Sequence, residues 1–142
     1  MKRLAFICAA LAVGAASGAQ AGDSNSIVGR VLVNPLSVTV NVPDAPRRRG
    51  AVFRISASVA NTGTSRLENV SVTLVRSPAL RLDRPATQVI PRIPPLASRR
   101  ADWDVCSNVP GSYVVLARAE VAPFTAESLG AVVQILPSNR IC

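Results

Sequence analysis

The sequence contains no histidine. Histidine is the side chain used most often as a general base, as the activator of a nucleophile and as a metal ligand. The glycines Gly63 and Gly111 fit turns, and the sequence has no GxSxG element, phosphate-cradling glycine pattern or cluster of metal-ligand residues. We therefore expect a protein that is not an enzyme and needs no cofactor or metal, with a small hydrolase as the remaining catalytic alternative.

Aromatic residues are also scarce, with one tryptophan, one tyrosine and three phenylalanines. A surface that stacks sugars or single-stranded nucleic acid lacks its usual material, so we expect no specific nucleic-acid partner. Strand alternation that sends Asp102 and Asp104 outward sends Trp103 into the core. Phe53 is likewise predicted to lie in the core, whereas Phe124, which follows Pro123 in the last hairpin loop, is free to be exposed.

One long apolar run is present, and it lies at the N-terminus. Lys2 and Arg3 precede the apolar stretch 4–16, and Ala19-Gln20-Ala21 provides a small-residue cleavage site, which is the layout of a secretory signal. The run is too short to span a membrane, which takes roughly 20 residues. We expect a signal peptide at 1–21 and one domain at 22–142, secreted or periplasmic, with no transmembrane segment after cleavage.

Cysteine usage agrees with export. With Cys8 removed in the signal peptide, Cys106 and Cys142 remain as an even pair in an oxidising compartment. A disulfide between them is the natural prediction, and two unpaired thiols are the alternative.

The mature sequence has the period-two pattern of β-strands with one buried face. Alternating apolar residues recur in 36–42, 53–59, 70–74, 101–105, 113–119 and 129–135. The proline-rich segment 77–96 is predicted to be an extended crossover or weak edge strand, with Thr87 to Ile90 as its best pairing segment. No segment has a sustained helical period, so seven or eight strands in two packed antiparallel sheets are expected, with a closed barrel as the alternative.

Several short sequences resemble a known family. Ile55 to Gly63, Leu67 to Leu74, Ile90 to Leu96 and the Pro110-Gly111-Ser112-Tyr113 turn resemble bacterial extracellular Ig-like modules of the CARDB (cell-adhesion-related) type and related modules beside α-galactosidase and peptidase domains. The resemblance covers roughly residues 50–121 and implies an all-β, Ig-like antiparallel β-sandwich. Tyr113 resembles a tyrosine corner, although Val115 stands where that motif has cysteine.

Two features depart from this family. Such modules usually occur in tandem or attached to a larger protein, whereas this sequence contains a single unit, which argues against a spacer role. The pair Cys106 and Cys142 is also not part of the family pattern.

Charged residues form two groups of interest. Asp102 and Asp104 follow Arg100 on the outward face of one strand, and Arg118 and Glu120 share the exposed register of the next, so we expect ion pairs between these strands. The run Arg47, Arg48 and Arg49 is predicted to be a solvated connection.

The chain carries a net charge of +8, and every cation after the signal is arginine. Two interpretations of the Arg47 to Arg49 run stay open: a solvated loop in an arginine-rich composition, or a contact with anionic envelope material. The sequence thus predicts a non-catalytic exported Ig-like binding or structural module that acts through protein or cell-envelope contacts. The alternative is an accessory or inhibitory subunit of an exported enzyme.

Overall fold

The computed structural model describes residues 32–142, so the expected signal peptide at 1–21 lies outside the described residues. The chain divides into two units, Met1–Val33 and Asn34–Cys142, and all the described strands belong to the second. Among residues 32–142, no helix is long and apolar enough to cross a membrane.

The second unit is built from ten strands. They are β1 (Leu36–Asn41), β2 (Arg47–Arg48), β3 (Phe53–Asn61), β4 (Leu67–Val75), β5 (Leu80–Leu82), β6 (Thr87–Ile93), β7 (Ser98–Ser107), β8 (Gly111–Val121), β9 (Phe124–Glu127) and β10 (Ala131–Leu136).

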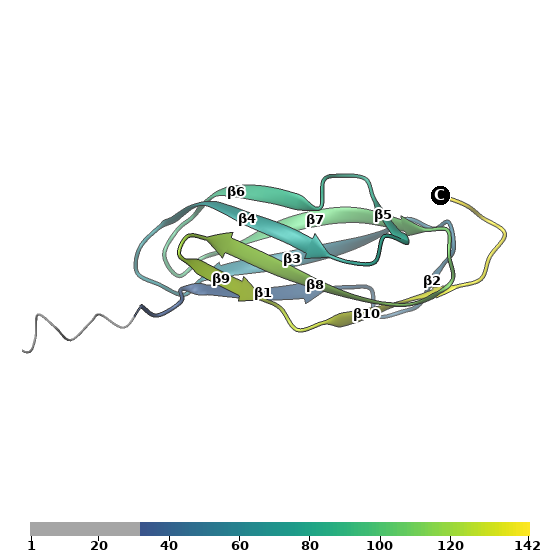
Figure 1. The fold of residues 1–142 in the computed structure, drawn as a ribbon, viewed down its shortest axis with the longest axis horizontal. Helices are drawn as coiled ribbons and strands as arrows, with labels where there is room; N and C mark the ends of the chain where they lie inside the picture. Colours follow the sequence, from purple (N-terminus) through teal and green to yellow (C-terminus); the bar gives the residue numbers. More distant parts are fainter. Residues whose placement is uncertain (1–31) are drawn as a thin grey trace, which may run out of the picture. The chain divides into compact units, whose positions relative to one another are not determined.

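Two sheets face each other in this unit (Figure 1). One sheet has the order β1-β3-β7-β5, and the other has the order β2-β10-β8-β4-β6, with β9 also paired to β8. All pairings are antiparallel except that of β2 with β10. The Ig-like antiparallel β-sandwich is therefore confirmed. The strand number exceeds the expected seven or eight because β2 and β5 are very short and the last strand is interrupted between β9 and β10.

The core lies between the sheets and is formed by the inward residues of the period-two pattern. Trp103 on β7 is fully buried, and its indole N–H donates to the Pro85 carbonyl at 3.0 Å, so a polar atom enters the core with a partner. Phe53 is buried as predicted, and Phe124 is half-buried against the core.

Alternation predicts that Leu129 points inward with Ala131 and Val133, but Leu129 is 90% exposed. The register changes by one residue between the pairs Arg118↔Glu127 and Val115↔Ala131, so the last strand carries one extra residue at this point. Such a β-bulge interrupts the alternation and turns the Leu129 side chain outward. Apolar periodicity alone does not reveal a one-residue insertion.

The proline-rich segment contributes to both sheets. Leu80–Leu82 pairs with β7, whereas Thr87–Ile93 forms the edge strand β6 beside β4. The predicted pairing segment Thr87 to Ile90 lies in β6, and the strand continues through Pro91. Proline is tolerated there because an edge strand needs hydrogen bonds on one side only.

The Asn61-Thr62-Gly63 sequence has a structural role at the turn between β3 and β4. The Asn61 side chain is 1% exposed and donates to the carbonyls of Ser65, Ile93 and Pro94 at 2.7, 3.1 and 3.2 Å. Its Oδ1 accepts the Gly63 N–H at 2.9 Å. One buried amide therefore ties the turn to the end of β6.

Tyr113 forms the expected tyrosine corner at the start of β8. Its hydroxyl donates to the Val109 carbonyl, four residues upstream, at 2.8 Å. Between them Gly111 has φ = 150°, a conformation that favours glycine. This contact fixes the passage of the chain from one sheet to the other.

Candidate functional site

The outward aspartates of β7 form ion pairs, but not with β8. Strands β7 and β8 belong to different sheets, so the expected pairing between their exposed residues is wrong. Asp104 instead accepts two hydrogen bonds from Arg54, its register partner on β3, at 2.9 and 3.2 Å. The Arg54 side chain holds the pKa of Asp104 below its usual value by hydrogen bonding.

Two other predicted members of this group also have different partners, and Glu120 forms no ion pair with residues 32–142. Arg100 bonds Asp102 on its own strand at 3.2 Å, and Arg118 bonds Glu127 on β9 at 2.6 Å. Sequence separation alone could not reveal that the strand following β7 enters the opposite sheet.

A small hollow of about 70 Å³ is lined by Arg54, Arg84, Asp102 and Asp104. Both of its aspartates are paired with an arginine, so each carboxylate already has a charged partner without a ligand. No group of three or more metal-binding side chains occurs within 32–142.

The Arg47 to Arg49 run is more ordered than the solvated connection that the sequence predicts. Arg47 and Arg48 form β2, which pairs in parallel with Ile135 and Leu136 of β10. The Arg49 backbone N–H continues the pairing with a 2.9 Å bond to the Leu136 carbonyl. Pairing with the last strand satisfies the backbone while the Arg47 and Arg48 side chains stay exposed.

A tight turn follows the run. The Ala51 N–H donates to the Arg48 carbonyl at 3.0 Å, and Gly50 has φ = 76°. Glycine suits the third position of a turn of this kind because a positive φ is strained for other residues. The Gly50 N–H also bonds the Ser107 carbonyl at 2.9 Å, which attaches the run to the end of β7.

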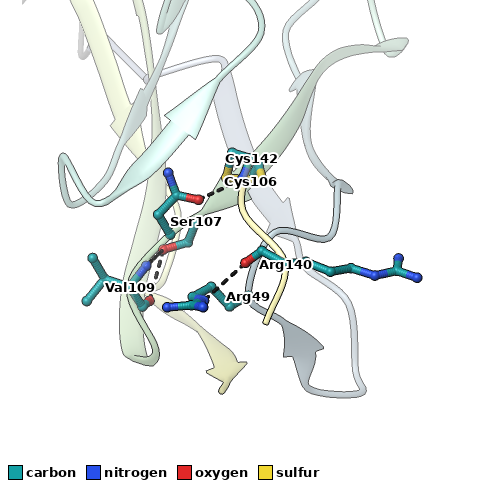
Figure 2. The surroundings of a disulfide bond; sticks show 7 residues. Arg49, Cys106, Ser107, Val109, Arg140 and Cys142 are labelled. Atoms are coloured by element: carbon teal, nitrogen blue, oxygen red, sulfur yellow. Dashed lines mark hydrogen bonds between the residues drawn. A yellow bond between two sulfur atoms is a disulfide. The ribbon is translucent and has the colours of Figure 1, made fainter. Parts of the chain in front are cut away.

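The C-terminal tail lies against this turn. Cys142 forms a disulfide with Cys106 on β7, with the two Cα atoms 5.9 Å apart, as the cysteine count predicts. Figure 2 shows the tail beside Arg49, whose Nε donates to the Arg140 carbonyl at 3.1 Å. A Cβ on Gly50 would lie 2.5 Å from the Arg140 carbonyl carbon, so glycine is required where the tail crosses the turn.

Arg47 to Arg49 differ from many other arginines of the domain in having no ion pair with a carboxylate of residues 32–142. Five described arginines form ion pairs with a carboxylate: Arg54, Arg66, Arg84, Arg100 and Arg118. None of Arg47 to Arg49 has such a pair within residues 32–142. Three consecutive positive charges thus stand on one ordered edge without a compensating ion pair. Guanidinium groups of this kind match phosphate and carboxylate oxygens.

The sequence identified the run itself but missed Arg140, which the tail brings next to it. The cysteine pair could have placed the tail near Cys106. Only the pairing of β2 with β10 shows that Arg49 lies there too.

A second hollow, of about 260 Å³, lies between β1 and the bulge that precedes β10. It is lined by Val38, Thr39, Val40, Ser128, Leu129, Gly130 and Ala131. Its lining is mainly apolar and contains no charged side chain.

Comparison with known proteins identifies the fold. No family model matches the chain, and no curated protein matches it. Among solved structures, it is similar to the CARDB domain of a Pyrococcus furiosus protein, with a TM-score of 0.51 and 12% identity over 72% of this chain and 94% of that one. A FixG-related protein from Vibrio parahaemolyticus gives a TM-score of 0.54 and 10% identity over 72% and 98% of the two chains.

A third similar structure is Escherichia coli alpha-2-macroglobulin from domain MG7 to the C-terminus, with a TM-score of 0.58 and 16% identity over 73% of this chain. The present chain spans only 17% of that structure and 7% of the native alpha-2-macroglobulin chain. At these identities the comparisons show a shared CARDB-like, Ig-like fold.

Proposed function

We propose that the protein is a non-catalytic, exported Ig-like module that binds an anionic polymer of the cell envelope through Arg47, Arg48 and Arg49. Export is supported by the signal layout of residues 1–21 and by the disulfide, a bond that persists in oxidising compartments. The observation that carries the binding role is the ordered edge of three arginines with no ion-pair partner among the described residues.

The position of the run favours a ligand outside the protein. β2 lies at the end of the sheet order, so no further strand covers it. Successive side chains of a strand point to opposite sides, which places Arg47 and Arg48 on the two sides of β2, and Arg49 follows in the turn. An extended polyanion can contact charges on both sides of an edge, whereas a single small anion cannot.

The test compares two variants of equal net charge. R47S/R48S/R49S removes the run, and R66S/R92S/R99S removes three exposed arginines that lie elsewhere. Long-chain inorganic polyphosphate serves as the polymer probe, with vesicles rich in phosphatidylglycerol as a second arm. At about fivefold per arginine, loss of the run lowers polyphosphate affinity about a hundredfold, and the control variant changes it much less.

Salt dependence provides a second readout, because a complex with fewer arginine contacts releases fewer counterions when it forms. The plot of log affinity against log salt becomes shallower for R47S/R48S/R49S than for the control. Equal losses in the two variants would show that net charge alone attracts the polymer, and would overturn the proposal. Binding to vesicles without binding to polyphosphate would replace the polymer with a membrane surface.

A further inference from the structure

We propose that Arg140 is a fourth binding residue of this site and that the Cys106–Cys142 disulfide is the element that positions it. The inference rests on the proposed function, because it extends the surface formed by Arg47 to Arg49. Arg47 to Arg49 alone do not depend on the disulfide, whereas the site with Arg140 is complete only when the tail is covalently attached.

The tail reaches the arginine run through few contacts. After β10 ends at Leu136, the Arg140 N–H donates to the Ser138 hydroxyl at 3.2 Å, and the Arg140 carbonyl accepts from Arg49 at 3.1 Å. The Cys142 N–H donates to the Asn108 side chain at 2.6 Å. All three bonds are exposed to solvent, so water competes for each of them. The disulfide is the one covalent link between the tail and the rest of the domain described at 32–142.

The side chain of Arg140 is free to meet a ligand. The residue is exposed, and it has no ion pair with any carboxylate of residues 32–142. In Figure 2 its side chain extends away from the guanidinium group of Arg49, while its backbone carbonyl faces Arg49. The Arg49–carbonyl bond thus uses the backbone of Arg140 and leaves its charge available.

The directions of the four side chains define the kind of ligand. Arg47 and Arg48 lie on opposite sides of β2, Arg49 follows in the turn, and in Figure 2 the Arg140 side chain extends away from the Arg49 guanidinium group. The four side chains thus point in different directions and do not converge on one point. A linear polymer with repeated negative groups therefore gains from all four arginines, whereas orthophosphate reaches only one or two.

Three variants separate the role of the arginine from that of the disulfide. R140S removes the charge, C106S/C142S removes the bond, and C106S/C142S/R140S removes both. R99S is the matched control, because Arg99 is an exposed arginine of β7 without an ion pair among residues 32–142. Affinity for long-chain polyphosphate is measured on folded protein, oxidised wherever both cysteines are present, with orthophosphate as the small-anion probe.

R140S lowers polyphosphate affinity about fivefold and makes the salt slope shallower by about one ion, and R140K restores most of the affinity. C106S/C142S gives a similar loss, and adding R140S to it costs nothing further, because the disulfide acts through Arg140. Orthophosphate affinity changes little in any variant.

Several results would overturn the inference. They are wild-type affinity for R140S, a loss for R99S as large as that for R140S, or additive losses when the cysteine and arginine changes are combined. If the serine pair does not fold, C106V/C142S takes its place, since Cys106 is 8% exposed and valine fills a similar volume. The Nε–H resonance of Arg140 in the oxidised wild type also has to shift on addition of polyphosphate, and an unchanged resonance contradicts a direct contact.

The two proposals fail differently. If R47S/R48S/R49S binds polyphosphate as well as wild type, the proposed function is wrong. If that variant loses binding while R140S and C106S/C142S do not, only the role of Arg140 and the disulfide is wrong.

Discussion

Breaking the Cys106–Cys142 bond should lower the stability of the domain substantially. The bond joins residues 36 positions apart and closes a loop that contains β8, β9 and β10. For a loop of this length the chain-entropy model gives about 4 kcal/mol of stabilisation, through the restriction of the unfolded chain. In a domain of this size that corresponds to a drop in Tm of up to about 15 °C.

The assay is thermal unfolding followed by circular dichroism, for oxidised protein, reduced protein and C106S/C142S. Reduced wild type and the serine variant should melt at similar temperatures, both well below the oxidised form. C106S/C142S with and without reductant is the control, because reductant then has no bond to break. An equal Tm for oxidised and reduced wild type would contradict this role of the disulfide, since the bond would then not limit the unfolded chain.

Three further predictions concern stability, a pKa and the pH dependence of binding. Asn61→Ala should lower the free energy of unfolding by about 2–4 kcal/mol in urea titrations, because the buried Ile93 carbonyl and the part-buried Ser65 carbonyl lose their donor, and a loss under about 1 kcal/mol would contradict its role. The pKa of Asp104, measured by NMR, should be lower in the wild type than in R54S. The contribution of ionised Asp104 to stability is present above its unfolded-state pKa and is lost as pH falls through its folded-state pKa. Polyphosphate affinity should stay nearly constant between about pH 5 and 8, because the chain lacks histidine; a steep change there would point to another titrating group.

Much of the fold could be predicted from side-chain alternation. The inward positions of β3, β4, β7 and β8 follow a period of two, and Trp103 and Phe53 lie in the core as that period requires. Alternation records which face of a strand is buried, but it does not say which strand lies alongside. For that reason the sequence predicts the wrong partner strand for Asp104, although it predicts the outward direction correctly.

The parts that could not be predicted depend on contacts between distant residues. The two-residue strand β2 exists because β10 lies beside it, and nothing in the sequence around Arg47 indicates a parallel partner as far along the chain as Ile135. The bulge that exposes Leu129 is a one-residue change of register. Arg140 joins the arginine run only through the path of the tail.

The most direct test of the arginine edge as a binding surface is a titration of isotope-labelled, oxidised protein with long-chain polyphosphate, followed by backbone amide resonances. The largest shifts should fall on Arg47 to Gly50, on the end of β10 and on residues 137–142. Shifts centred on Arg99 and Arg100 of β7, or spread evenly over the exposed arginines, would contradict binding at this edge.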